Sequence, residues 1–254
     1  DVPGWYNHYF HTKDIFLSLV YLLAKDDFYY LDFAEFSARY HYPRVAVDEG
    51  RVATVRRKLG AHGVATGARL LVVNPNTSPE LAPEARRWPA ERYGELARQL
   101  LAEYPDAHVA FIGTKGEKAY VDAVAATARD PRAFGMAGEL DLRELLALFS
   151  ITDVLVSNDS GPMHLACLVD TPTVGLFFAD TPTLFAPIGT RTAAVAPALY
   201  SMPLFTVYNG KDIVVGRPTD VIRNTAACTV SVEKVMTEAR RIIGSSPRAA
   251  MSVN

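Results

Sequence analysis

The sequence feature that most limits the fold of this chain is a regular alternation of short apolar runs and longer helical segments from Leu70 onward. Apolar runs bounded by turn residues favour buried strands, and strands that alternate with helices are typical of a parallel sheet covered on both faces. The pattern predicts an α/β fold with a doubly wound parallel sheet over residues 66–245. The predicted strands are residues 70–73, 108–112, 133–136, 154–156, 173–178 and either 190–196 or 204–207, and the predicted helices are 89–103, 115–129, 141–149 and 232–243.

The stretch ITDVLVSNDSGPMHLACL, residues 151–168, predicts a strand, a tight turn and a helix. Ser160 is the expected N-cap, Gly161 allows another molecule to approach the backbone, and Pro162 lies where a missing N–H costs little. A helix that starts after a parallel strand has unpaired N–H groups at its first turn, and its dipole favours an anion there. The turn is therefore a candidate phosphate site.

Two polar side chains beside this turn refine the prediction. His164 lies in the first helical turn and adds a donor, whereas the carboxylate of Asp159 repels phosphate unless it faces sugar hydroxyls. The combination favours a sugar phosphate or sugar diphosphate. An ordinary N-capped helix start is the alternative. A Ser160, His164 and Asp159 hydrolase fits poorly, because the sequence has no G-x-S-x-G motif and a histidine four residues on points along the helix.

The loop over residues 74–89 follows the first predicted strand and is long for a connection of this kind, which favours a functional role. Thr77 and Ser78 offer hydroxyls, and Arg86 and Arg87 offer guanidinium groups that suit phosphate oxygens. Because this loop and the Ser160 turn both follow parallel strands, we expect one anion to be bound from both sides. The alternative is a solvated loop that only packs the start of the next helix.

Three further turns are weaker candidates. The GTKG turn at residues 113–116 lacks the spacing of a Walker A loop or a dinucleotide fingerprint, and we expect it to touch a base or ribose. Gly138 and Glu139 hold the equivalent place before the next helix and are expected at the same ligand. Residues 180–183 are candidates for sugar contacts.

Composition excludes several classes of protein. The net charge of −2 over 254 residues argues against a dedicated nucleic-acid binder, which normally carries a basic face. Cys167 and Cys228 make neither a disulfide framework nor a metal site, so no metal is expected and a reducing, cytoplasmic setting is the default. The apolar run at residues 15–24 is too short to span a bilayer, and a core helix is expected there.

Several segments closely resemble the carboxyl-terminal half of glycosyltransferase family 9, the bacterial lipopolysaccharide heptosyltransferases. They are RRWPAERYGELARQL, VAFIGTKGE, GMAGELDLRELLALFSITDVLVSNDSGPMHLA and TPTVGLF, and the match runs from residue 70 to 243. The resemblance implies a GT-B architecture, in which two Rossmann-like domains face each other across a cleft. It implies that residues 1–65 are the end of the N-terminal acceptor domain and a linker, that 66–245 bind the nucleotide sugar, and that 246–254 are a tail.

The resemblance also implies roles for individual residues. Thr77, Ser78 and Arg86 would contact donor phosphate, with Arg86 standing where the family usually has lysine. Asp159 would face the donor sugar, and Gly113 and Glu139 would border the nucleoside. The diphosphate would be held at the helix start by Ser160, Gly161, Met163 and His164.

The implied reaction is an inverting transfer of a heptose or related sugar to a lipopolysaccharide or other surface glycan. Arg86, His164 and Asp159 form the implied catalytic set of this chain, and the base that deprotonates the acceptor is expected upstream of Asp1. No metal or other cofactor is implied, because the helix start and these side chains stabilise the departing diphosphate. The expected partners are a nucleotide-sugar donor and a lipid-linked acceptor, with the protein cytoplasmic and peripheral on the inner membrane.

Two alternatives of another kind stay open on the sequence. One is a non-catalytic or truncated module that binds a nucleotide sugar without transfer activity. The other is a sugar-nucleotide epimerase of the GT-B type, which needs acid and base carboxylates inside the cleft and converts the donor without an acceptor.

Overall fold

The structure is a computed structural model that describes residues 11–24, 32–77, 86–178, 181–197 and 227–244. Several sequence-based predictions fall elsewhere. Ser78, Asp180, the alternative last strand at residues 204–207 and the tail at 246–254 lie outside the described residues.

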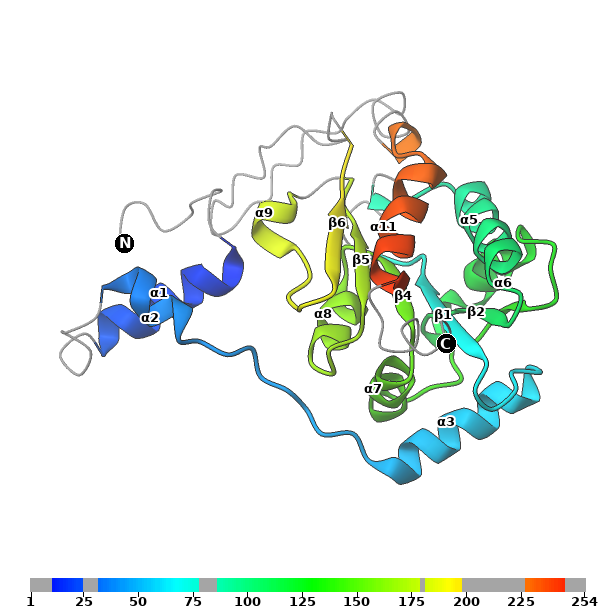
Figure 1. Ribbon diagram of the computed structural model, residues 1–254, viewed down its shortest axis with the longest axis horizontal. Coiled ribbons are helices and arrows are strands. Elements are labelled where there is room, and N and C mark those ends of the chain that lie inside the picture. The colour runs from blue at the N-terminus through cyan, green and yellow to red at the C-terminus, as the bar shows by residue number, and fades with distance from the viewer. Residues whose placement is uncertain (1–10, 25–31, 78–85, 179–180, 198–226, 245–254) are drawn as a thin grey trace.

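The described chain is built on one six-stranded sheet in which every neighbouring pair of strands is parallel. The strand order is β3-β2-β1-β4-β5-β6 (Figure 1), which is the order of a doubly wound Rossmann sheet. The predicted α/β fold class is therefore confirmed. The strands are β1 (Arg69–Asn74), β2 (Ala107–Phe111), β3 (Ala133–Gly135), β4 (Val154–Asn158), β5 (Thr173–Leu176) and β6 (Thr192–Val195).

Helices cover both faces of this sheet, and the residues of β1 show why. Leu71 and Val73 are buried among residues of the first layer, whereas Leu70 and Val72 are buried among residues of the second, because successive strand side chains point to opposite faces. The first layer is α5 (Ala90–Glu103), α6 (Lys118–Ala126) and α11 (Val232–Gly244), and the second is α3 (Glu49–Ala61), α7 (Leu142–Ser150) and α8 (Gly161–Cys167).

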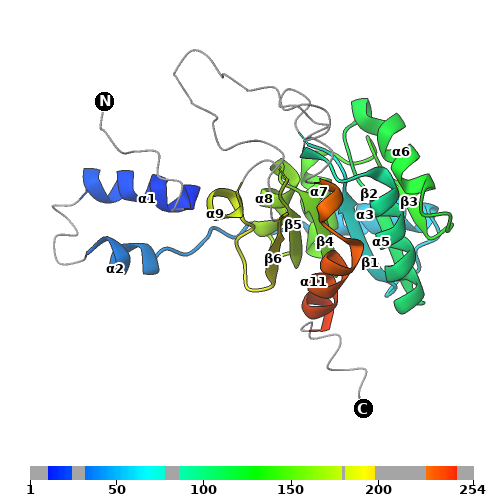
Figure 2. The same ribbon diagram turned by 90° about the horizontal axis from the view of Figure 1, so that it is seen from above.

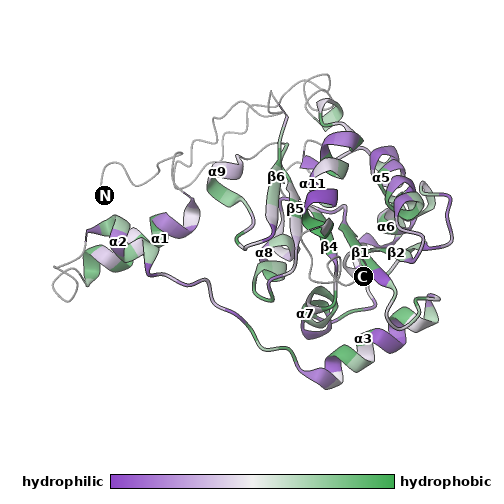
Figure 3. Ribbon diagram, viewed as in Figure 1, coloured by the Kyte–Doolittle hydropathy of each residue, from purple (hydrophilic) through white to green (hydrophobic). Residues whose placement is uncertain are grey.

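Hydropathy follows the same arrangement. Figure 3 shows apolar residues in the central strands and many polar residues on α5 and α11. Both α5 and α11 bury an apolar side, with Leu96 and Val235 fully buried. The sheet is therefore covered by an apolar layer on each face. A ligand can reach it at the edge where the strands end, which is called the carboxyl edge below.

Local signals placed most helix starts correctly. Asp48 caps α3 and Asp141 caps α7, the latter with Glu144 as its capping-box partner. The predicted helix 115–129 is instead a short 3₁₀ turn, η1 (Lys115–Glu117), followed by α6, which ends at Ala126. Three residues later, Arg129 adopts φ of 53°.

Residues 45–47, an apolar triplet, form no strand. The amide of Val45 donates to the carbonyl of Leu168 at 2.9 Å, which is one contact rather than a ladder. The chain is extended there and is fastened to the sheet unit by Arg44, which pairs with Asp170 at 2.8 Å. An apolar triplet is thus not enough for a strand where no neighbouring strand is available.

Two helices before this segment lie away from the sheet, beyond α9 (Pro182–Phe185), as Figures 1 and 2 show. These are α1 (Thr12–Leu23) and α2 (Phe33–Ala38), whose aromatic rings pack on each other through Tyr21. Only Leu17 of α1 is buried, and Leu23 is 89% exposed, so the prediction of a core helix here is wrong for the described residues. No described helix combines the length and the apolar character needed to cross a membrane.

Candidate functional site

The strand order reverses between β1 and β4, and the loops that follow these two strands meet at the carboxyl edge. Arg86, at the end of the first loop, places Nη2 3.1 Å from Asp159 Oδ2 and 3.5 Å from the Asp159 carbonyl. Their side chains are 12% and 13% exposed. The structure therefore brings the guanidinium of one loop into contact with the turn of the other, at the place where doubly wound sheets bind ligands. This region between the two loops is called the crevice below.

The last residue of β1 is hydrogen-bonded to the Ser160 turn. Asn74 is buried, and its Nδ2 donates to Ser157 Oγ at 3.0 Å and to Ser160 Oγ at 2.8 Å. Ser160 Oγ in turn donates to the carbonyl of Asn158 at 3.1 Å. These bonds fix the serine rotamer against the sheet.

A second buried chain of hydrogen bonds runs beside the first. Tyr93 of α5 donates its hydroxyl to Asn158 Oδ1 at 2.7 Å, and Asn158 Nδ2 donates to the carbonyl of Pro75 at 2.8 Å. Burial raises the pKa of the Tyr93 hydroxyl well above its usual value, so this donor keeps its proton. Both loops of the crevice are thereby held by neutral amides and a hydroxyl.

Ser160 is the N-cap of α8 in its backbone, as predicted, but its side chain makes no capping bond to the helix. The cause is the competition just described, because Oγ is engaged by Asn74 and Asn158. The same contacts argue against a hydrolase, whose nucleophilic hydroxyl would be paired with the histidine.

The residues after Ser160 differ in what they offer the crevice. Gly161 is exposed, and a Cβ added to it would meet open space. Met163 is fully buried. Its sulfur packs against Gly175 of β5, where an added Cβ would lie only 2.7 Å from the sulfur. The Met163 side chain therefore belongs to the core, and only its backbone is available to hold a diphosphate.

His164 lies on the same side of the turn as Asp159, with Nε2 3.9 Å from Asp159 Oδ1 and a side chain that is 39% exposed. Burial lowers the pKa of the His164 imidazole below its ordinary value, and the charge of His11 lowers it further. At neutral pH the ring is therefore an uncharged donor rather than a cation.

The first residues of the loop after β1 contain an unused donor. Thr77 is 3% exposed, and within the described ranges its hydroxyl has no hydrogen-bond partner. A buried hydroxyl without a partner is a natural contact for a bound ligand. Arg87, by contrast, lies over the ring of Tyr120 at 4.4 Å, so the two adjacent arginines diverge and only Arg86 faces the crevice.

The loops after β2 and β3 pack closely against this region. A Cβ on Gly113 would come within 2.8 Å of Asn76 Nδ2 in the loop after β1. Gly138 adopts φ of +79° and donates its N–H to the Gly113 carbonyl at 2.9 Å. Next to it, the carboxylate of Glu139 accepts from His62 Nε2 at 3.0 Å. The structure thus joins Gly113 and Glu139, the two residues predicted to border a nucleoside, at one place.

The GTKG turn does not resemble a phosphate loop in the structure. The carboxylate of Glu117 accepts from the backbone N–H and the hydroxyl of Thr114, at 2.7 and 2.8 Å, and closes η1 as a capped turn. Both donors of Thr114 are thereby satisfied within the turn and are not directed at an anion.

Sequence reasoning missed the buried polar residues that shape the crevice: Asn74, Asn76, Asn158 and Tyr93. A signal was present, since an asparagine closes each of the two strands beside the switch in strand order. A buried amide at a strand end requires partners, and here the partners come from the opposite loop.

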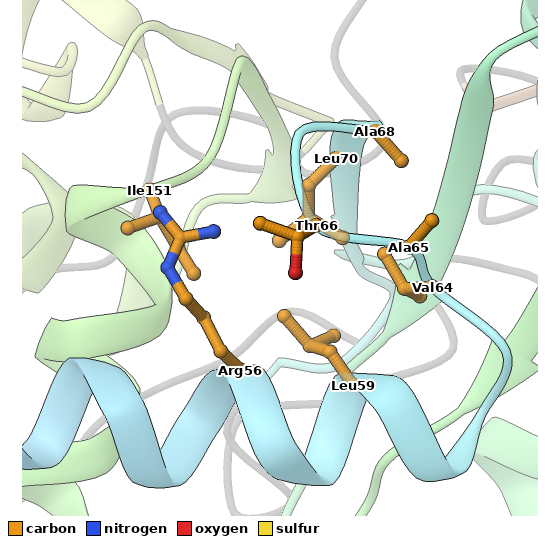
Figure 4. A pocket seen from close by; sticks show the side chains of 8 residues that line it. All are labelled: Arg56, Leu59, Val64, Ala65, Thr66, Ala68, Leu70 and Ile151. Atoms are coloured by element: carbon orange, nitrogen blue, oxygen red, sulfur yellow. The ribbon is translucent and has the colours of Figure 1, made fainter.

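A small hollow at the other edge of the sheet holds none of the predicted residues. Figure 4 shows it between α3 and the start of β1, with Arg56 and Thr66 turned toward it. Its remaining lining is apolar: Leu59, Val64, Ala65, Ala68, Leu70 and Ile151. It lies where the strands begin and is therefore separate from the crevice.

Comparison with known proteins identifies what the chain is similar to. The family model described as glycosyltransferase family 9 (heptosyltransferase) matches residues 21–209. Lipopolysaccharide heptosyltransferase 2 of Salmonella typhimurium is 33% identical over 113 residues, which are 44% of this chain and 32% of that protein. Lipooligosaccharide heptosyltransferase 2 of Haemophilus influenzae is 27% identical over 156 residues, which are 60% of this chain and 44% of that protein. The chain spans less than half the length of these relatives.

Two solved structures share the fold. The Escherichia coli ADP-heptose lipopolysaccharide heptosyltransferase II matches with a TM-score of 0.61 at 20% identity, over 80% of this chain and 54% of that one. The glycosyltransferase family 9 structure from Veillonella parvula matches with a TM-score of 0.62 at 21% identity, over the same shares of the two chains.

Proposed function

The chain belongs to glycosyltransferase family 9, and from that premise we propose that it binds a nucleotide-diphosphate sugar for transfer of a heptose or related sugar to a lipopolysaccharide or other surface glycan. The observation that carries the proposal is the meeting of Arg86 and Asp159 in the crevice between β1 and β4. ADP-heptose is the proposed donor, because the Escherichia coli protein of similar fold is an ADP-heptose heptosyltransferase. A lipid-linked acceptor and a cytoplasmic location at the inner membrane complete the proposal.

The ion pair of Arg86 and Asp159 supports a division of roles within the crevice. A guanidinium has five N–H donors, so Arg86 can hold the carboxylate and still bind a phosphate oxygen. The carboxylate of Asp159 would repel a phosphate, and its contact with Arg86 offsets that charge. Asp159 is then left to accept from hydroxyls of the donor sugar.

The diphosphate is proposed to lie between the two loops of the crevice. In this proposal the diphosphate is contacted by the Thr77 hydroxyl, which has no partner among the described residues, by the Arg86 guanidinium and by the His164 ring. Ser78, the next residue of the same loop, is proposed as a further contact. The backbone at Ser160, Gly161 and Met163 faces it from the other side. Gly113 and Glu139 border the nucleoside.

The proposed reaction is an inverting displacement at the anomeric carbon. The acceptor oxygen forms the new bond to this carbon and gives its proton to a base that is not assigned to this chain. The bond from the anomeric carbon to the diphosphate breaks, and its electron pair goes to the phosphate oxygen. Arg86, the His164 N–H and the first amides of α8 stabilise the developing charge, and we propose no metal or other cofactor for this step.

A nucleotide-sugar-binding module without transfer activity is the second candidate. Calorimetry with ADP, GDP and UDP, followed by a transfer assay with ADP-heptose and heptose-deficient lipopolysaccharide, separates the two. Binding with transfer supports the enzyme, and binding alone supports the module. Conversion of the donor without an acceptor supports the epimerase, and absence of nucleotide binding overturns all three.

His164 provides a sharper test of the diphosphate position. We expect His164→Ala to weaken ADP binding about tenfold, the loss of roughly one hydrogen bond to a charged group, and to leave adenosine binding unchanged. Calorimetry with both ligands measures the effect, and His41→Ala, at an exposed position, is the control. Equal losses for ADP and adenosine would remove His164 from the phosphate contacts.

A further inference from the structure

The corner formed by Gly138 and Glu139 after β3 is fixed on its inner side by close packing. A Cβ on Gly138 would come within 2.9 Å of Lys115 Cα, so the backbone of the corner lies directly on the loop after β2. The bond from the Gly138 N–H to the Gly113 carbonyl, at 2.9 Å, sets the register of the two loops. This packing fixes the backbone but leaves the direction of the Glu139 side chain to other contacts.

The outer side of the same corner is held by α3, which precedes the sheet in the sequence. Lys58 Nζ donates to the carbonyl of Glu139 and to both carboxylate oxygens of Glu144, the latter at 2.9 and 2.8 Å. An ammonium has three N–H donors, and all three are used here. The Glu144 side chain is 9% exposed and also caps α7, so Lys58 joins the corner to the start of that helix.

His62, at the end of α3, contacts the Glu139 carboxylate directly. Its Nε2 lies 3.1 Å from Oε1 and 3.0 Å from Oε2, so one N–H is shared between the two oxygens. The His62 ring stacks on Phe134 of β3 with centroids 4.5 Å apart and planes at 12°. The ring is thereby fixed, and it fixes the carboxylate in turn.

The Glu139 carboxylate keeps acceptor capacity in this arrangement. Its side chain is 33% exposed, and a carboxylate offers about four acceptor positions, of which the shared His62 N–H uses the inner two. A fixed carboxylate at the carboxyl edge of a Rossmann sheet suits the hydroxyls of a ribose. The same geometry would be lost if Glu139 were free to rotate.

We infer that Lys58 and His62 are positioning residues that hold Glu139 for the nucleoside end of the bound nucleotide. The inference rests on the proposed function, because it requires a nucleotide in the crevice. Neither residue is expected to touch the ligand, and their bonds go to Glu139 and Glu144 rather than to Arg86 or Asp159. Their loss should therefore weaken nucleoside contacts and spare diphosphate contacts.

The test uses three probes on the full chain: ADP, adenosine and inorganic pyrophosphate, with dissociation constants from calorimetry or from competition with a fluorescent ADP. We expect His62→Phe, which retains the stacking on Phe134, and Lys58→Met to raise the dissociation constants for ADP and adenosine by about five- to tenfold. Pyrophosphate binding should change by less than about twofold. His62→Gln, whose amide can still donate to Glu139, should restore most of the affinity.

Arg51→Met is the matched control. Arg51 also lies on α3, and its Nη1 donates to Asp141 Oδ2 at the start of α7 at 2.9 Å. Unlike Lys58 and His62, it makes no bond to Glu139 or Glu144 among those described. It should leave binding of all three probes unchanged. A double variant of Glu139→Ala with His62→Phe should lose no more ADP affinity than Glu139→Ala alone, because His62 acts through Glu139.

The outcomes separate this inference from the proposed function. Failure of the unaltered protein to bind ADP overturns both. If the unaltered protein binds ADP and the His62→Phe and Lys58→Met proteins bind it as tightly, only the positioning role is overturned. Parallel losses for ADP, adenosine and pyrophosphate would mean general loosening of the fold and would also overturn it. Should Lys58→Met fail to fold, the comparison of His62→Phe with His62→Gln decides.

Discussion

The two halves of the carboxyl edge are built from different chemistry. Around β1 and β4, apart from the Arg86–Asp159 pair, the loops are joined by buried, neutral hydrogen bonds among the side chains of Asn74, Asn158, Ser160 and Tyr93 and the Pro75 carbonyl. Around β2 and β3 they are joined by close backbone contact and by the partly exposed side chains of Lys58 and His62 at the end of α3. Neutral buried bonds are insensitive to pH and salt and costly to leave unmade, whereas partly exposed ion pairs respond to both.

This difference fits the charge that each half is proposed to meet. A diphosphate brings negative charge, and a neutral framework beneath it shapes the loops without adding charge of its own. The positive charge of Arg86 and the dipoles of the turn then remain directed at the ligand. A nucleoside is uncharged. The loops around β2 and β3 that are proposed to contact it can therefore be held by charged side chains such as Lys58 and Glu144 without electrostatic repulsion of the ligand.

The largest effect is expected from breaking the neutral half at Asn158. Asn158→Ala removes the acceptor of the Tyr93 hydroxyl and the donor of the Pro75 carbonyl, and both groups stay buried. We expect the free energy of unfolding to fall by about 2–6 kcal/mol, at about 1–3 kcal/mol for each of the two unsatisfied groups. Urea denaturation followed by circular dichroism measures it.

The control for this variant is Ser150→Ala, which removes one partly buried hydroxyl at the end of α7, bonded to the Ala147 carbonyl. It should change the free energy of unfolding by less than about 0.5 kcal/mol. If Asn158→Ala were equally mild, the hydrogen bonds beneath the crevice would not be what holds its two loops together.

A smaller, pH-dependent effect is expected from the charged half at Lys58. The hydrogen bond from Lys58 holds the pKa of the Glu144 carboxyl below its usual value, with help from the backbone N–H of Asp141. A carboxyl with a lowered folded pKa stabilises the fold above its unfolded pKa of 4.5, and this contribution is lost as the pH falls through the folded value.

Lys58→Met should therefore lower the free energy of unfolding by about 1 kcal/mol at pH 7, since the pair is partly exposed. The difference from the unaltered protein should shrink as the pH falls below 4.5 and through the lowered folded pKa of Glu144, because Glu144 then gains its proton. Asn158→Ala should show the same loss at both pH values. Urea midpoints at pH 7 and at acidic pH make the comparison, and a pH-independent loss for Lys58→Met would erase the distinction between the halves.

The fold could be read from the sequence because its signals are local. Apolar runs with turn residues at their ends placed the strands from β1 to β5, and the starts of α7 and α8 were expected at Asp141 and Ser160. The end of a strand also has a known position in a doubly wound sheet, so the loops carrying Arg86 and Asp159 could be expected at one edge.

What the sequence did not show depends on partners that are distant along the chain. Asn74 and Ser160 are 86 positions apart, and Lys58 and Glu144 are also 86 apart, so no local pattern pairs them. The divergence of Arg86 and Arg87 is decided by the position of Tyr120 on another helix. The exposure of α1 has the same cause, because periodicity predicts an apolar face but not what packs on it.

The smallest effect is expected from Lys118→Gln, which tests whether the location of an ion pair decides its contribution. Lys118 and Asp122 form a 2.9 Å pair one turn apart on α6, and their hydrogen bond raises the pKa of Lys118. Their side chains are 55% and 45% exposed, so water screens their attraction and also the weaker one that Lys118 feels from Glu139, and both partners lie on one helix. The urea midpoint and the ADP dissociation constant should both match those of the unaltered protein. A midpoint shift as large as that of Lys58→Met would mean that any lysine pair contributes as much as the one that joins α3 to the corner at Glu139.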